Sequence, residues 1–193
     1  GAAGLDTGSE SSGTATWYYV YLVQGTPGTS AVLSTNASTP TLPAGYKYYR
    51  RIGAVMNWTD DDLQDFDMLG SGRVRTTYWN ERPAEFQKAL DAGVSHSAWA
   101  EVSVANFVSP KADEFYIQVS ATAGASNNVR LRAKDYTPTG ASGTNTTQLQ
   151  VAANMAQYNV VWMNCGGTKS FEHYHDNAAS RLTATIRAFR ETL

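Results

Sequence analysis

The sequence predicts an all-β protein with a β-sandwich or jelly-roll-like fold. Two segments near the start, 17–23 and 46–55, are dense in aromatic and β-branched residues and are bounded by Gly, Pro, Ser and Thr. Later segments alternate apolar and polar residues with the period of two that strands require. Strand-like segments recur at roughly 8–12 residues with Gly, Asn and Ser turns between them, which is typical of sandwiches and jelly rolls.

The first part of the chain is predicted to contain three strands, at 16–24, 30–34 and 47–58. Residues 25–28 form a turn, because Pro27 presets one backbone dihedral and Gly28 accepts positive φ. Two prolines and a glycine interrupt the segment before the third strand, so it is expected to be an extended loop. In the third strand a period of two predicts one shared face for four residues: Tyr49, Arg51, Gly53 and Val55.

A hairpin is predicted next, with arms at 63–69 and 73–79 around a Gly-Ser-Gly turn. The acidic run at 59–62 is interpreted as a solvated loop whose charge opposes pairing between strand edges. Residues 86–90 favour a strand, although Pro83 would also suit the first position of a helical turn.

The second half of the chain is predicted to be strand-rich throughout. The expected strands are 98–104, 115–120, 129–134, 148–151, 158–163, 170–175 and 181–190. The composition becomes more charged around 80–93, which suggests a junction. We therefore expect an N-terminal β region at 1–80 and a C-terminal β-sandwich at 81–193, with one continuous domain as the alternative.

Composition excludes several classes of function. The net charge is −2 with an isoelectric point of about 5.9, so nucleic acid is not an expected partner. Cys165 is the single cysteine, which rules out an intrachain disulfide. No run of about 18 apolar residues exists, so membrane insertion is not expected. The first residues lack the basic and apolar regions of a signal peptide, and we expect them to come from the interior of a longer polypeptide.

No catalytic motif is present, and the chain is predicted not to be an enzyme and to need no cofactor. The sequence has no Gly-x-Ser-x-Gly elbow, and Gly70-Ser71-Gly72 lacks the Lys and the helix of a phosphate-binding loop. Carboxylates are available for glycoside hydrolysis but stand in no recognisable motif. Cys165, at a predicted strand end, is interpreted as a small buried hydrophobe.

Two histidines form the sharpest candidate metal site. In a strand, residues two apart point to the same face, so His173 and His175 could reach one metal ion. Three symmetric copies would supply six imidazoles, which is an octahedral set. The alternative is that both are ordinary surface histidines of a polar strand.

Aromatic residues at strand ends are the candidate ligand-binding residues. Trp58, Tyr78 and Trp79 lie beside polar loops, where an exposed ring could stack on a sugar. The tryptophans within predicted strands are assigned to the core: Trp17, Trp99 and Trp162.

Four segments carry a resemblance to a known family: GLDTGS at 4–9, TWYYVYL at 16–22, LST at 33–35 and PTLPAGYKYYRRIGAV at 40–55. They resemble a segment of tailed-bacteriophage tail fibres and other virion tail proteins. The similarity covers roughly the first 58 residues well, and the rest resembles the β-sandwich that usually follows. The resemblance implies a non-enzymatic structural module, usually a homotrimer, near the fibre end that meets the host. It supplies no catalytic residues.

The sequence therefore predicts a structural or adhesion component of a phage tail that contacts host-surface glycan. The expected location is the extracellular virion tail, and the expected partners are sister copies, other virion tail proteins and host-surface polysaccharide. The alternatives are a purely structural virion protein (baseplate, collar or decoration), a carbohydrate-binding module of a secreted bacterial protein, and a glycan-cleaving tailspike fragment.

Overall fold

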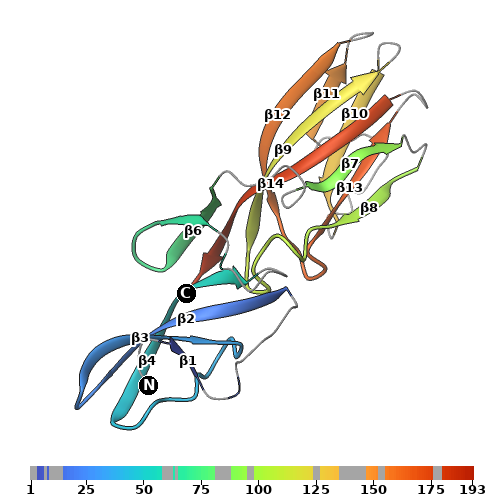
Figure 1. Cartoon of the computed structure of the whole chain (residues 1–193). Helices are drawn as coiled ribbons and strands as arrows, with labels where there is room; N and C mark the ends of the chain where they lie inside the picture. Colours follow the sequence, from blue (N-terminus) through green and yellow to red (C-terminus); the bar gives the residue numbers. More distant parts are fainter. Residues whose placement is uncertain are drawn as a thin grey trace. The chain divides into compact units, whose positions relative to one another are not determined.

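The computed structural model describes residues 4–6, 8, 15–57, 63, 65–80, 88–94, 98–123, 127–134, 147–151, 155–175 and 180–193. These residues form strands and no helix, so the chain is all-β as predicted, and none of them forms a helix able to cross a membrane. The chain folds as two compact units (Figure 1). The first comprises Gly1–Asn80, Ser109–Lys111 and Glu191–Leu193, and the second comprises Glu81–Val108 and Ala112–Arg190.

The first unit is built on a sheet whose strand order is β1-β3-β2-β4. Its strands are β1 (Gly4–Leu5), β2 (Thr16–Gly25), β3 (Gly28–Ser34) and β4 (Tyr46–Asn57). β1 is parallel to β3, and the other pairs are antiparallel. A hairpin of β5 (Phe66–Leu69) and β6 (Val74–Trp79) also belongs to this unit. Gly28 has a φ of 111°, which explains why the tight β2–β3 connection uses glycine.

Alternate residues of β2 form the core of the first unit. Tyr19, Tyr21 and Val23 are at most 4% exposed and pack with Val32 and Ala54. Burying each large apolar side chain stabilises the fold by about 1.5–3 kcal/mol. The Tyr21 hydroxyl donates to the Asn36 carbonyl across 2.8 Å, so this buried polar atom is satisfied.

A bulge in β4 corrects one prediction. Tyr21 stands opposite Arg51, whereas its neighbour Val20 stands opposite Gly53, so Ile52 is an extra residue on β4. An extra residue exchanges the two faces of a strand beyond it. Tyr49 and Arg51 therefore share the core face, but Gly53 and Val55 lie on the opposite face, and the predicted single face is wrong past Ile52.

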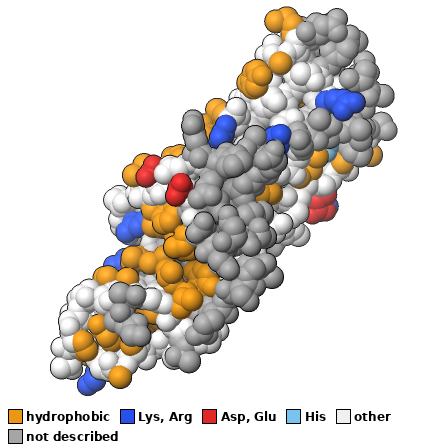
Figure 2. Space-filling view, in the orientation of Figure 1, with side chains coloured by type: hydrophobic (Ala, Val, Ile, Leu, Met, Phe, Trp, Pro, Cys, Tyr) orange, Lys and Arg blue, Asp and Glu red, His pale blue; other side chains and the backbone are white. Residues whose placement is uncertain are grey.

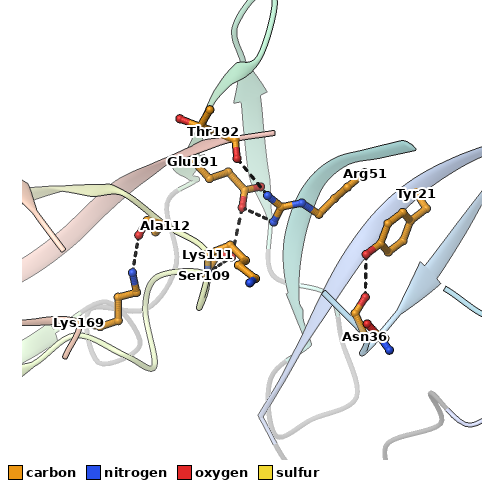
Figure 3. A network of polar contacts seen from close by, with 9 residues as sticks. All are labelled: Tyr21, Asn36, Arg51, Ser109, Lys111, Ala112, Lys169, Glu191 and Thr192. Atoms are coloured by element: carbon orange, nitrogen blue, oxygen red, sulfur yellow. Dashed lines mark hydrogen bonds and ion pairs between the residues drawn. The ribbon is translucent and has the colours of Figure 1, made fainter. Parts of the chain in front are cut away.

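A cluster of charged and polar side chains connects the last residues of the chain to the rest of the first unit (Figure 3). The Arg51 guanidinium lies 3.2 Å from the Glu191 carboxylate and also donates to the Thr192 carbonyl across 3.1 Å. The Ser109 hydroxyl donates to the same carboxylate across 3.3 Å. Leu193 donates its amide to the Arg73 carbonyl, so the end of the chain takes part in the first unit.

The described strands of the second unit form two antiparallel sheets, in the orders β12-β9-β14-β7 and β11-β10-β13-β8. They are β7 (Lys88–Val94), β8 (Ala100–Ser103), β9 (Glu114–Ala123), β10 (Asn127–Ala133), β11 (Thr147–Val151), β12 (Ala156–Asn164), β13 (Ser170–His175) and β14 (Ser180–Thr192), which extends into the first unit. Consecutive strands alternate between the sheets, except for the β10–β11 pair, and the last strand returns beside the first. This order is that of an eight-stranded jelly roll.

The two sheets of the second unit enclose an apolar core. Inward side chains alternate along β9 and β14, and their members are all 0% exposed: Phe115, Ile117, Val119, Ala121, Leu182, Ala184 and Ile186. The rings of Phe115 on β9 and Phe171 on β13 lie 6.4 Å apart, which places the two sheets face to face. The predicted sandwich or jelly-roll class is therefore confirmed.

Candidate functional site

The candidate site lies on the face of the first sheet that points away from its core. The register of three strands sets it: Gln24 of β2 stands opposite Thr29 of β3 on one side and Tyr48 of β4 on the other. Leu22 stands opposite Arg50 one step further along. Since Tyr21 and Val23 point into the core, the residues between and beside them point outward.

These residues line an open hollow of about 260 Å³, whose lining also includes Val23 and Tyr49. Tyr48 is 69% exposed and Leu22 is 43% exposed. The hollow thus combines an open aromatic ring, an aliphatic side chain, a guanidinium, an amide and a hydroxyl. Its volume is slightly below the range of about 300–1,000 Å³ for drug-sized ligands.

The sheet beneath the hollow is held firmly. Tyr49 packs edge-on against the buried Tyr21, with ring centroids 5.8 Å apart. At the end of β2, Thr26 donates its amide to the Gly45 carbonyl across 3.0 Å. A Cβ on Gly25 would stand 2.0 Å from that carbonyl oxygen, so glycine is required for this close approach. These contacts fix the position of the cross-strand pair Gln24 and Tyr48, called the Gln24–Tyr48 rung below.

The aromatic residues predicted to bind ligand lie elsewhere. Trp79 is 6% exposed, and its ring lies 5.9 Å from that of Trp17, so it offers no open ring face in this chain. Tyr78 is 36% exposed on the β5–β6 hairpin. Trp58 lies outside the described residues. The aromatic and basic segment that contains Tyr48 and Arg50 could have indicated this site. The bulge at Ile52 cannot be recognised in the sequence, however, so the sequence does not show which of these residues share a face.

The two candidate metal ligands lie inside the jelly roll. His173 and His175 are each 2% exposed, so neither is the surface histidine considered above. Their Nδ1 and Nε2 atoms lie 2.9 Å apart, and His175 Nδ1 lies 2.5 Å from the Ser180 hydroxyl. No group of three metal-binding side chains occurs among the described residues. A six-imidazole cage between copies needs surface histidines, so burial argues against it. A metal held by the two residues stays a prediction.

A second polar group covers the outer face of the β10–β13–β8 sheet. Arg132 lies over the Trp99 ring at 4.1 Å and donates to Glu172 across 2.6 Å. Lys134 lies 2.8 Å from the Glu101 carboxylate, and this hydrogen bond lowers the pKa of Glu101. Because these side chains bind one another, the group is best explained as a structural network.

Tryptophan positions in the second unit differ from the expected core placement. Trp99 and Trp162 are half-buried on outer faces, and each ring lies under a guanidinium. Arg190 lies 4.3 Å above the Trp162 ring and binds Glu114 across 2.6 Å. The sequence analysis assigned both tryptophans to the core, whereas in the structure each ring stacks against an arginine guanidinium.

Comparison with known proteins gives no family. No protein-family model and no curated protein matches the chain. Among solved structures, the chain is similar to the coat protein of Tobacco streak virus, at 10% identity and a TM-score of 0.33 over 58% of this chain and 92% of that one. It is also similar to a family 29 carbohydrate-binding module from Piromyces equi, at 10% identity and a TM-score of 0.25 over 91% and 90%. At these TM-scores neither likeness bears on function.

Proposed function

We propose that this chain is a non-catalytic attachment module of a virion tail, a tail fibre or receptor-binding protein, that binds host-surface polysaccharide. The observation that carries the proposal is the open hollow on the first sheet, where Tyr48 presents its ring beside Arg50 and Gln24. The same unit contains the segments that resemble phage tail fibres.

The chemistry of the hollow fits a saccharide. The Tyr48 ring can stack on the C–H face of a pyranose, because aromatic faces carry partial negative charge. Arg50, Gln24 and Thr29 offer donors and acceptors for sugar hydroxyls. Among the described residues that line the hollow, none is a carboxylate, whereas glycoside hydrolysis usually needs two. The arrangement therefore supports binding rather than cleavage.

An open site of this kind binds one sugar segment weakly, so we propose that attachment depends on several copies. A homotrimer would present three hollows to one polysaccharide, and linked sites raise the overall affinity by about 10²–10⁴-fold without new contacts. The proposed location is the extracellular virion tail.

Binding of the whole chain to host capsular or lipopolysaccharide fractions, measured by biolayer interferometry, tests the proposal. Tyr48→Ala should weaken binding about tenfold, which corresponds to about 1.4 kcal/mol. Tyr78→Ala, an exposed tyrosine of the same unit, serves as the control and should bind like the parent. Loss of binding in the Tyr78 variant alone would move the site to the hairpin. If the parent binds no host polysaccharide, the proposal is wrong, and a purely structural virion protein becomes the alternative to test.

A further inference from the structure

The three long strands of the first sheet carry positive charge and no negative charge. Residues 16–57, which include β2, β3 and β4, contain no Asp or Glu, whereas they contain Lys47, Arg50 and Arg51. Over the region where Figure 1 labels these strands, the described residues visible in Figure 2 show Lys and Arg side chains and no Asp or Glu side chain. The charge of these strands therefore favours an anionic ligand over a cationic one.

Arg50 is the arginine of this sheet whose charge is available to a ligand. The neighbouring Arg51 lies on the core face and binds the buried Glu191 carboxylate. The Arg50 side chain is exposed and lines the hollow, and it makes no ion pair or hydrogen bond with any residue that the structure describes. An arginine held in this way offers its full set of N–H donors to the contents of the hollow.

The described carboxylates of the first unit do not line the hollow. Asp6 is 4% exposed, and its carboxylate accepts a hydrogen bond from a backbone amide across 2.7 Å. Glu191 is 0% exposed and belongs to the ion pair described above. Asp65 lies just before β5 and Asp67 lies within it, and neither is part of the lining. Among these residues, none supplies a counter-ion for Arg50, so a ligand can supply it.

Tyr48 and Arg50 are placed to act on one sugar residue. They stand two positions apart in β4, so their side chains leave the same face of the strand from points about 7 Å apart. Gln24 and Leu22 stand opposite them on β2. A pyranose stacked on the Tyr48 ring would therefore direct a group at its edge towards the guanidinium of Arg50.

We infer that the polysaccharide bound in this hollow is acidic, and that Arg50 binds a carboxylate carried by the sugar ring that stacks on Tyr48. The planar guanidinium matches the two oxygens of a carboxylate with two parallel N–H donors. A phosphate monoester carries about two negative charges, whereas the lining provides a single cation, so a carboxylate matches it better. The inference rests on the proposed function and names the substrate class of the same site.

The test compares one acidic polysaccharide in two chemical forms. The probe is the uronic-acid-containing fraction of host surface polysaccharide, untreated or after carbodiimide activation and borohydride reduction, which turn its carboxylates into neutral hydroxymethyl groups. In biolayer interferometry, the whole chain should bind the untreated form about tenfold more tightly than the reduced form, because a charge-assisted pair is lost. Equal binding of both forms, or binding to a neutral host fraction alone, overturns the inference but not the proposed function. Binding to no host fraction overturns both.

A pair of variants assigns the preference to Arg50. Arg50→Gln should bind the untreated form about tenfold more weakly than the parent chain and should bind the reduced form equally well. Arg73→Gln is the matched control, because Arg73 is an exposed arginine of the same unit that does not line the hollow, and it should keep the preference of the parent. If Arg50→Gln keeps the preference, or if Arg73→Gln loses it, Arg50 does not hold the carboxylate and the inference is wrong. Tyr48→Ala should weaken binding to both forms, which tests the proposed function separately.

Discussion

Arg51 and Glu191 form an ion pair across 3.2 Å although 140 residues separate them in the chain. The Glu191 side chain is 0% exposed and that of Arg51 is 16% exposed. Two further donors or acceptors join the pair, the Ser109 hydroxyl and the Thr192 carbonyl. A carboxylate this deeply buried needs its cation, because an uncompensated charge in a low-dielectric interior is costly.

Replacing Arg51 by Ala should therefore destabilise the protein by about 3–5 kcal/mol, the cost of leaving one member of a buried pair alone. Urea unfolding followed by circular dichroism measures the change. The control is Arg190→Ala, which removes the more exposed pair with Glu114, whose side chains are 38% and 31% exposed, together with the stacking on Trp162, and should cost about 0.5–2 kcal/mol. Equal costs for the two variants would show that the Glu191 carboxylate is not held by Arg51.

The stability of the first unit should decrease at alkaline pH because of Tyr21. Burial raises the pKa of the Tyr21 phenol from 10.0 to about 12. The raised pKa means that the folded state favours the protonated phenol, so its contribution to stability is complete below pH 10 and is lost as the pH rises towards 12. Tyr21→Phe should lower stability at pH 8 by about 1 kcal/mol, through the lost bond to Asn36. Between pH 10 and 12 the thermal midpoint of the Tyr21→Phe variant should fall less than that of the parent. An equal fall in both proteins would contradict the assignment of this pH dependence to Tyr21.

Cys165 should be chemically silent in the folded protein. Burial raises the pKa of its thiol from 9.0 to about 12, and only the thiolate reacts with disulfide or alkylating reagents. At pH 8 the native protein should not react with a coloured aromatic disulfide, and the urea-unfolded chain should react fully. The same shift removes stability as the pH rises from 9 to 12. Rapid labelling of the native protein would mean that the thiol is reachable by solvent.

The buried imidazoles should act as hydrogen-bonding residues. His175→Leu removes the contacts to His173 and Ser180, and we expect a loss of about 2–3 kcal/mol. A chelator should leave the thermal midpoint of the parent unchanged, and elemental analysis should find no bound transition metal. A midpoint lowered by the chelator in the parent, but not in the His175 variant, would support the predicted metal site instead.

Strand positions could be predicted from the sequence because a period of two and turn residues are local features. The predicted strand at 158–163 is β12, and that at 181–190 is most of β14. Residues 88–90 form a strand, as favoured over the helical turn, while residues 86–87 lie outside the described ranges. The sandwich class followed from the number and spacing of such segments.

Long-range relationships could not be predicted in the same way. Nothing local to Arg51 specifies a partner at Glu191, because strand order and bulges decide which residues meet. The bulge at Ile52 decides that Tyr48 and Arg50 face outward together, and one extra residue leaves no clear mark in composition. His173 and His175 were correctly placed on one face, but whether that face is inward depends on the second sheet.

The backbone beside the hollow provides the last prediction. Gly25→Ala would place a Cβ 2.0 Å from the Gly45 carbonyl oxygen, a backbone atom that cannot rotate away. The β2 end must then shift from β4, which separates Gln24 from Tyr48 and should lower both the thermal midpoint and polysaccharide binding. Gly167→Ala is the matched control, because no atom lies within 4 Å of its added Cβ, and it should leave both readings unchanged. If Gly25→Ala lowers the midpoint while binding stays intact, the ligand is not held by the Gln24–Tyr48 rung, because that rung is the part of the hollow next to the displaced backbone.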